Sequence, residues 1–436
     1  MTLKQKFIHY VSANMISMIG LSLYILADTF FIAKGIGANG LTALNLALPI
    51  YNLISGLGML IAIGGAAQFI TYKATKNRHD ANNVFLHGLI LVLLFGAVFV
   101  FFGLAYSSEL ASILGATKAI HGMTSTYLKY VMIFAPAFML NNVLSAYTKN
   151  DGDPHLAMIG MLAGSLFNII FDYIFIFPCH LGMLGAVLAT AFSPVIGILI
   201  LLTRFINHKS SIHFEHIHFN INLVIKTFTL GFPSLINEVS GGVVMLVFNY
   251  LILHIAGNIG VAAYGVIVNI YLVILAFFNG IAQGVQPLMG ECYAKENHED
   301  LEKVRHHALI LGIVIAIIVY LLTVFFKSPI VSAFNSEHNK TLQSLAETGL
   351  LLYFIAPLFA SFNIITIMYL ISINQPLPAQ LVTLLRGIII LIPAALILSA
   401  TMKMTGIWLT LPLTELLTAP IEIKFKHQPK RSGTQY

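Results

Sequence analysis

Long apolar segments separated by short polar ones dominate the hydrophobic pattern of this chain. Runs such as 89–104 and 310–326 are continuous and not alternating, so they predict membrane-crossing helices and exclude the short alternating strands of a closed barrel. The pattern predicts an all-α polytopic membrane protein with twelve transmembrane helices. The expected spans are 7–32, 41–71, 84–106, 124–148, 155–177, 184–206, 228–254, 261–291, 307–326, 344–372, 379–400 and 404–423.

The second half of the chain repeats the first at a shift of 220 residues. Asn77 and Asp80 then match Asn297 and Asp300, and such polar matches in register are not a by-product of shared apolar composition. The repeat predicts two pseudo-symmetric six-helix lobes in parallel orientation, related by an axis along the membrane normal. The expected parts are an N-lobe (1–206), a cytoplasmic inter-lobe linker (207–227), a C-lobe (228–423) and a cytoplasmic tail (424–436).

Composition and charge agree with this topology. Only 9% of residues are charged, against about 25% in an ordinary soluble domain. Sixteen of the 23 Lys and Arg residues fall in segments on one predicted side, together with both termini, and six fall on the other. The positive-inside rule then places both termini in the cytoplasm. We expect a multi-pass protein of the bacterial inner membrane, monomeric, surrounded by lipid and without a nucleic-acid partner.

One carboxylate, Asp28, lies within the apolar stretch 18–34. An ionised side chain at the centre of a membrane helix costs roughly 2.5–3.5 kcal/mol on insertion scales. Such a residue is expected to face a protein cavity, where it is paired or reversibly protonated. The alternative is an Asp that caps backbone groups near a helix end. We favour an ion-coupling site in a transporter.

Several stretches resemble signatures of the multidrug and toxic compound extrusion (MATE) family, which belongs to a superfamily that includes lipid and polysaccharide flippases. The similar stretches are Ala27-Asp28-Thr29 with Gly35-Ile36-Gly37, Asn150-Asp151-Gly152-Asp153-Pro154 with the following Asn168 and Asp172-Tyr173-Ile174, and Gln283-Gly284 with Gln286-Pro287-Leu288. Arg386 and the run Gly406-Ile407-Trp408 are most similar to the staphylococcal multidrug-efflux branch of this family. The resemblance implies a MATE-like fold and a secondary active multidrug exporter.

The resemblance also implies an N-lobe cation or proton site, formed by Asp28, Asn168, Asp172 and Thr190. Asn168 and Asp172 are four residues apart, so they share a helix face. Two carboxylates in a low-dielectric site repel each other, and amide and hydroxyl oxygens can complete a shell for Na⁺. The alternative for Asp172 is that it only caps or braces helices.

Charged residues within the predicted C-lobe spans are Glu238 and Arg386. Each is costly alone, so one could neutralise the other, or they could take part in coupling or substrate binding. Further C-lobe candidates are Asn269, Tyr271 and Gln283, and Glu415 is a weaker one. Aromatic and amide-bearing faces suit flat cationic drugs, but they also suit plain helix packing. The cavity candidates are Tyr51, Asn52, Asn141, Asn142, Phe278 and Asn279.

The sequence contains no motif for nucleotide binding or for a catalytic nucleophile. No Gly-x-x-x-x-Gly-Lys-Ser/Thr loop occurs, so we expect no ATP hydrolysis, no enzyme activity and no cofactor other than a coupling ion, H⁺ or Na⁺. A metal site could be formed by the spacing of His213, His216 and His218. Their place in the linker instead favours a solvated or interfacial segment without metal. The expected partners are drugs and organic cations. Two alternatives remain: a lipid-linked precursor flippase, which would need a basic cavity, and a non-transporting membrane receptor or scaffold.

Overall fold

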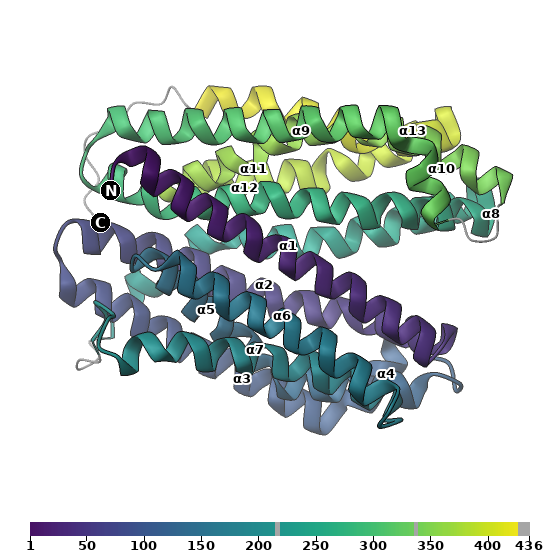
Figure 1. Cartoon of the computed structure of the whole chain (residues 1–436), viewed down its shortest axis with the longest axis horizontal. Helices are drawn as coiled ribbons and strands as arrows, with labels where there is room; N and C mark the ends of the chain where they lie inside the picture. The colour runs from purple at the N-terminus through teal and green to yellow at the C-terminus, as the bar shows by residue number, and fades with distance from the viewer. Residues whose placement is uncertain (214–218, 335–338, 426–436) are drawn as a thin grey trace.

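The computed structural model describes residues 1–213, 219–334 and 339–425, and these ranges are almost wholly α-helical (Figure 1). Lipid cannot bond to backbone groups, and a helix satisfies them within itself. The elements are α1 (Leu3–Gly35), α2 (Ala38–Ala74), α3 (Arg78–Ile113), α4 (His121–Ile133), α5 (Ala135–Asn150), α6 (Pro154–Ile176), α7 (Gly182–Ile206), α8 (Ile221–Ala294), α9 (His298–Phe334), α10 (Lys340–Tyr353), α11 (Ala356–Ser372), α12 (Pro376–Leu384), the π-helical turn η1 (Leu385–Ile389) and α13 (Leu391–Phe425).

The described helices give twelve passes through a membrane. Nine helical runs can cross on their own, α8 counting as two because its backbone breaks at Gly257, and the bent pairs α4–α5 and α10–α11 bring the number to eleven. The run Pro376–Pro420 has 45 residues, about twice what one crossing needs. Its backbone breaks at Lys403 (φ 54°), and Gly406 lies against the carbonyl of Leu398, so the chain reverses there and crosses twice. The prediction of twelve helices is confirmed.

Local structure recurs in the two halves of the chain. α4 meets α5 at 46° and α10 meets α11 at 45°, and each bend lies just before an Ala-Pro pair. Proline lacks a backbone N–H and disturbs the preceding helical turn, which explains why these two predicted spans are bent. The side-chain oxygens of Asn77 and Asn297 accept from the backbone N–H groups of Asp80 and Asp300 at 3.2 and 3.1 Å. The internal repeat is thus visible in both bends and caps.

Two clusters of buried apolar side chains stabilise the bundle. One is built mainly from α2 to α7 and includes Phe85 and Tyr147, and the other is built mainly from α8 to α13 and includes Phe278 and Trp408. In Figure 1 the helices α2 to α7 form the lower half and α8 to α13 the upper half, with α1 running between them. Because lipid is as apolar as these side chains, close packing holds each half together.

The two halves meet where α2 lies along α8. A Cβ at Gly64 would collide with the carbonyl of Thr227, and a Cβ at Gly231 would collide with that of Leu60. Small residues allow such backbone approach in membrane interfaces. Gln68 is wholly buried here and donates to Oγ1 of Thr227 at 2.8 Å.

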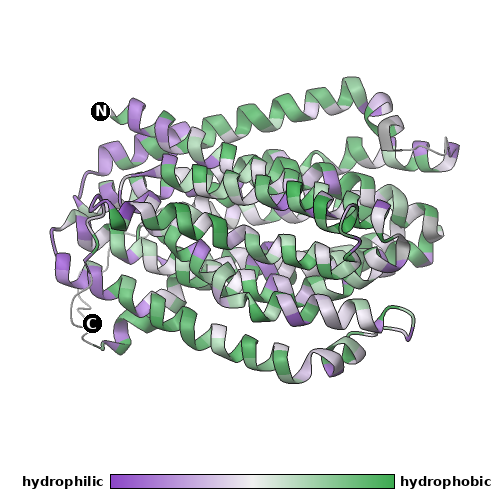
Figure 2. Cartoon of the chain, turned by 60° about the horizontal axis from the view of Figure 1, so that its bottom comes forward, coloured by the Kyte–Doolittle hydropathy of each residue, from purple (hydrophilic) through white to green (hydrophobic). Residues whose placement is uncertain are grey.

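Hydrophilic residues gather most densely at the end of the bundle that holds the start of α1 (Figure 2). We call it the basic end, because Lys4, Lys73, Lys149, Arg204 and Lys295 lie at helix termini there. The opposite end carries fewer basic residues. Among the described residues, the structure therefore gathers these five at one end, as expected for residues on one side of the membrane.

Candidate functional site

Two buried carboxylates face each other in the N-terminal half. Asp28 of α1 is 7% exposed and Asp172 of α6 is fully buried, and their side chains are close enough to share a hydrogen bond. Two ionised carboxylates this close in a low-dielectric site repel strongly and titrate as a pair. The pair therefore requires a shared proton or a bound cation.

Asn168 and Thr190 lie beside this pair. Asn168 is one turn before Asp172 on α6, and Thr190 is on the neighbouring α7. With its NH₂ group toward Asp172, the Asn168 amide donates to Oδ2 at 3.1 Å. Its oxygen then accepts from the backbone N–H and hydroxyl of Thr190 at 3.2 and 3.3 Å. The structure thus brings together the four residues proposed from the sequence.

Tyr127 of α4 also belongs to this site, and the sequence analysis did not identify it. Its ring is buried, its hydroxyl hydrogen-bonds the Thr190 side chain, and it lies within electrostatic reach of both carboxylates. A Tyr in an apolar helix looks like a packing residue in the sequence, so only the contact between α4 and α7 reveals its role. Tyr24 of α1 extends the polar region, since its hydroxyl is 3.3 Å from that of Tyr51 on α2.

One oxygen of each carboxylate lacks a partner. Oδ1 of Asp28 and Oδ1 of Asp172 are buried without a hydrogen bond to any described residue. An unsatisfied buried acceptor costs about 1–3 kcal/mol. Carboxylate, amide and hydroxyl oxygens are suitable ligands for a proton or a hard cation such as Na⁺.

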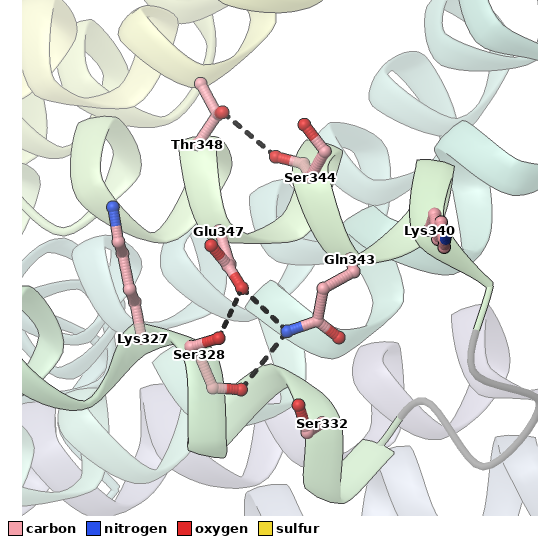
Figure 3. A pocket seen from close by; sticks show the side chains of 8 residues that line it. All are labelled: Lys327, Ser328, Ser332, Lys340, Gln343, Ser344, Glu347 and Thr348. Atoms are coloured by element: carbon pink, nitrogen blue, oxygen red, sulfur yellow. Dashed lines mark hydrogen bonds between the residues drawn. The ribbon is translucent and has the colours of Figure 1, made fainter.

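A polar pocket of about 500 Å³ lies between α9 and α10 at the opposite end of the bundle (Figure 3). There Glu347 accepts hydrogen bonds from Ser328 Oγ at 2.8 Å and from Gln343 Nε2 at 2.7 Å. Because these polar groups satisfy one another and lie in the other half of the chain, we do not assign this pocket to the carboxylate site.

The buried charges of the C-terminal half form a pair that differs from the predicted one. Arg386 of η1 binds Glu415 of α13, with Nη2 2.6 Å from Oε1 and Nε 3.2 Å from both carboxylate oxygens. Asn363 of α11 donates to Oε2 of Glu415 at 2.6 Å. The expectation that Arg386 and Glu238 neutralise each other is wrong, because the hairpin at Lys403 brings Glu415 beside η1.

Glu238 instead lies where α8 faces α2. A Cβ at Gly56 of α2 would be 3.3 Å from Cβ of Glu238, and the Glu238 carboxylate is near the hydroxyl of Tyr51. Glu238 is partly exposed. It therefore lies between the two halves and remains a candidate for coupling or substrate binding.

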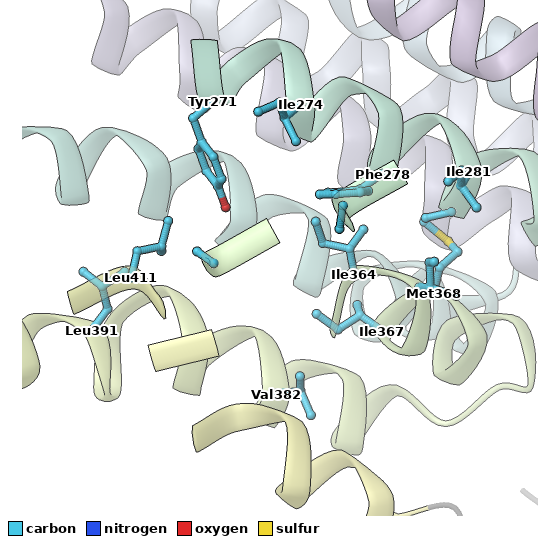
Figure 4. Close-up of a cluster of buried hydrophobic side chains, with 14 of the residues drawn as sticks. Tyr271, Ile274, Phe278, Ile281, Ile364, Ile367, Met368, Val382, Leu391 and Leu411 are labelled. Atoms are coloured by element: carbon cyan, nitrogen blue, oxygen red, sulfur yellow. The ribbon is translucent and has the colours of Figure 1, made fainter. Parts of the chain in front are cut away.

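Tyr271 and Phe278 lie among the buried apolar side chains of the C-terminal half (Figure 4). Phe278 is wholly buried, so it is a packing residue in this conformation. Tyr271 packs edge-on against Tyr353, with ring centroids 5.3 Å apart, and lies near the ion pair formed by Arg386 and Glu415. Tyr271 is thus part of the surroundings of that ion pair.

The remaining predicted residues lie at helix contacts or are half-buried. Among the amides, Asn52 lies near Gly242 of α8, Asn141 against Gly197 of α7, and Asn142 against Gly58 of α2. Gln283 accepts from Nζ of Lys149 at 3.0 Å, which places it at the basic end. Asn269 and Asn279 are half-buried on α8.

The linker histidines are only partly covered by the structure. His216 and His218 lie outside the described residues. His213 is exposed, and its backbone N–H donates to Oδ1 of Asn82 at 3.1 Å.

Comparison with known proteins gives a consistent result across the chain. The family model MatE matches residues 14–174 and 233–422. The chain is 26% identical over 419 residues to the multidrug export protein MepA of Staphylococcus aureus, covering 94% of this chain and 90% of that protein. It is 27% identical over 421 residues to MepA of Staphylococcus saprophyticus, with the same coverage.

The fold is shared with solved structures. One, described as the outward-facing conformation of a multidrug resistance MATE family transporter of the MOP superfamily, matches with a TM-score of 0.92 and 22% identity. The match covers 98% of this chain and 95% of that one. At this identity the likeness establishes the arrangement of the helices and nothing finer.

Proposed function

Because this chain belongs to the MatE family of membrane transporters, we propose that it exports hydrophobic, cationic small molecules from a bacterial cell, driven by an inward flow of H⁺ or Na⁺. The observation that carries the proposal is the buried pair of Asp28 and Asp172, each with one unpartnered oxygen. A transporter needs a site whose occupancy changes the relative stability of its conformations. The relatives named MepA support multidrug export as the activity.

In the proposed cycle the carboxylate pair holds the coupling ion in only part of the cycle. Binding of a proton or Na⁺ removes the repulsion between Asp28 and Asp172, and loss of the ion restores it. The ion shifts the conformational equilibrium by its difference in affinity for the two conformations, and by no more than that difference. Tyr127 and Thr190 would complete the polar shell.

We place the basic end in the cytoplasm, following the positive-inside rule. The halves are joined there by hydrogen bonds such as the one from Gln68 to Thr227. A solved transporter of the same fold is described as outward-facing. These observations support a cycle in which the basic end is closed in the present conformation and the substrate leaves at the opposite end.

The contact between the halves offers groups for an organic cation. Glu238 supplies a carboxylate near the Tyr51 hydroxyl, and aromatic faces attract cations by about 0.5–2 kcal/mol. A flippase would instead need basic groups for a pyrophosphate, and the Arg386 guanidinium is engaged by Glu415. The structure therefore favours export of cationic compounds.

Ethidium efflux from cells that express the chain tests the proposal. We expect Asp28→Asn and Asp172→Asn to lose efflux, since neither variant can form the carboxylate pair. Glu109→Gln, an exposed carboxylate on α3, is the matched control and should retain wild-type efflux. Equal membrane levels of all variants are verified by immunoblot. Full efflux by both aspartate variants would contradict the coupling site.

A further inference from the structure

Asp151 lies in the turn between α5 and α6 at the basic end, and its side chain is only 1% exposed. A buried carboxylate requires partners, because an unpaired buried charge is costly. This one is outside the carboxylate site, and the mechanism proposed above does not use it.

The partners of Asp151 come from three separate segments. Nζ of Lys73 at the end of α2 is 2.6 Å from Oδ1, and Nε of Arg204 at the end of α7 is 3.0 Å from Oδ2. In the segment that follows α7, Ser210 Oγ and the Ser211 backbone N–H donate to Oδ2 at 3.1 and 3.0 Å, and the Ser211 hydroxyl donates to Oδ1. Asp151 thus ties the start of the inter-half connection to the ends of α2 and α7.

The turn itself does not require an acid. The equivalent turn in the C-terminal half, between α11 and α12, also precedes a proline and also has a residue with positive φ, Asn374 (56°) in the place of Gly152 (101°). At the position of Asp151 it has Ile373. The same backbone therefore forms with an apolar residue, and the charge of Asp151 serves something other than the turn.

The residues just before Asp151 cross to the other half. Nζ of Lys149 donates to Oε1 of Gln283 at 3.0 Å, and Nδ2 of Asn150 donates to Oε1 of Gln286 at 3.0 Å. All four side chains are buried. With the hydrogen bond from Gln68 to Thr227, these two contacts form what we call the basic-end gate. Asp151 holds the turn next to Lys149 and Asn150, which make two of the three contacts of this gate.

We propose that Asp151 is a positioning residue that keeps the basic-end gate closed. It fixes the α5–α6 turn in the place where Lys149 and Asn150 reach α8. The inference rests on the proposed function, because it assumes that the basic end opens during transport. Loss of the Asp151 charge should favour the conformation in which the basic ends of the halves are apart.

Distances between spin labels in the purified, lipid-reconstituted full chain test this inference without a transport assay. Cys179→Ser and Cys292→Ser remove the native thiols. One label pair replaces Arg78 and His298, exposed residues at equivalent positions of the two halves at the basic end. The other replaces Lys118 and Met402, exposed residues at the opposite end.

We expect Asp151→Asn to raise the ratio of molecules with longer to molecules with shorter Arg78–His298 distances about tenfold or more, the change produced by loss of one charged hydrogen bond. In Asp151→Asn labelled at the other pair, the Lys118–Met402 distances should shorten. The combined Ser210→Ala and Ser211→Ala change, which leaves Lys73 and Arg204 paired with Asp151, should give a smaller shift of the same sign. Asp80→Asn, whose partners are local to the start of α3, should match the parent.

The outcomes separate the two proposals. Suppose that the distance distributions of the parent change with pH or Na⁺, and that those of Asp151→Asn and of the serine variant are identical to the parent's. The gate assignment is then overturned and the proposed function stands. If neither the parent nor any variant populates a second distance at either end, alternating access itself is overturned. Damage to the fold alone would broaden the distance distributions of both label pairs, without lengthening the Arg78–His298 distance and shortening the Lys118–Met402 distance.

Discussion

At the residue scale, the buried carboxylates of the two halves have different partners. In the N-terminal half, Asp28 and Asp172 face each other with no basic partner among the described residues. In the C-terminal half, Glu415 is held by Arg386. A carboxylate neutralised by an arginine cannot exchange its counter-ion, whereas a pair of carboxylates can take up a proton or cation. This difference supports the proposal that the coupling ion binds in the N-terminal half.

Removal of the Tyr127 hydroxyl tests the shell around that site. A hydrogen bond contributes about 1 kcal/mol, or roughly fivefold in affinity. We expect Tyr127→Phe to raise by about that factor the coupling-ion concentration that gives half-maximal efflux. Tyr130→Phe, one turn along α4 and half-exposed, is the control. If the two variants behave alike, Tyr127 does not contribute to ion binding.

The ion pair of Arg386 and Glu415 makes a separate prediction about stability. Loss of one partner leaves an unpaired buried charge and costs about 3–5 kcal/mol. Arg386→Met and Glu415→Gln should each lower the unfolding temperature, and the double variant should recover most of the loss. The fluorescence of Trp408, the single tryptophan and buried in the same half, reports the transition. A double variant no more stable than the single ones would contradict a structural pair.

Only part of the N-terminal site has a local signal in the sequence, because Asp28 is a lone charge in an apolar run and Asn168 and Asp172 share a helix face. The grouping of these three residues with Thr190 was implied by the resemblance to the MATE family. The partner of Arg386 could not be predicted, because Glu415 is 29 residues away across a hairpin whose facing surfaces no periodicity specifies. Tyr127 was missed because its ring is equally suited to packing.

At the element scale, the sequence predicts helix number better than helix shape. Apolar length predicts the twelve passes. The bends of α4–α5 and α10–α11 were not predicted, although each follows from an Ala-Pro pair once the structure is known. The π-helical turn η1 and the tight reversal at Lys403 were not predicted. Both depend on contacts with neighbouring helices, such as that of Gly406 with Leu398.

The close contact of α2 and α8 depends on two glycines. A Cβ at Gly64 would collide with the carbonyl of Thr227, so Gly64→Ala should separate the helices near the basic end. With Ala67→Cys as a buried reporter in a chain without native cysteines, maleimide labelling should be about fivefold faster or more, a change of about 1 kcal/mol. Gly241→Ala on α8, where a Cβ meets nothing within 4 Å, is the control. Equal labelling rates would show that the approach is not needed.

At the scale of the whole molecule, Asp151 should not contribute to the pH response near neutral pH. Burial alone would raise the pKa of Asp151, but the Lys73 ammonium and hydrogen bonds from Lys73 and Ser211 outweigh it, and the pKa lies below its usual range. A carboxyl with a lowered folded-state pKa stabilises the protein above its unfolded value of about 3.9, and this is lost only as pH falls through the lower folded value.

The unfolding temperature of Asp151→Asn should therefore stay below that of the wild type by a constant amount between about pH 5.5 and about pH 8. Thermal unfolding at several pH values in this window measures the difference. A gap that closes as the pH falls toward the lower value would show that Asp151 takes up a proton in this range.

The whole account depends on exchange of substrate for an ion at one pair of carboxylates. The most direct measurement is ion movement in proteoliposomes of the purified chain, with a pH-sensitive dye or labelled Na⁺ inside and ethidium added outside at zero membrane potential. We predict ethidium-dependent movement of one of the two ions in the wild type and in Glu109→Gln, and none in Asp28→Asn or Asp172→Asn. Ion movement at the wild-type rate in both aspartate variants would contradict the account.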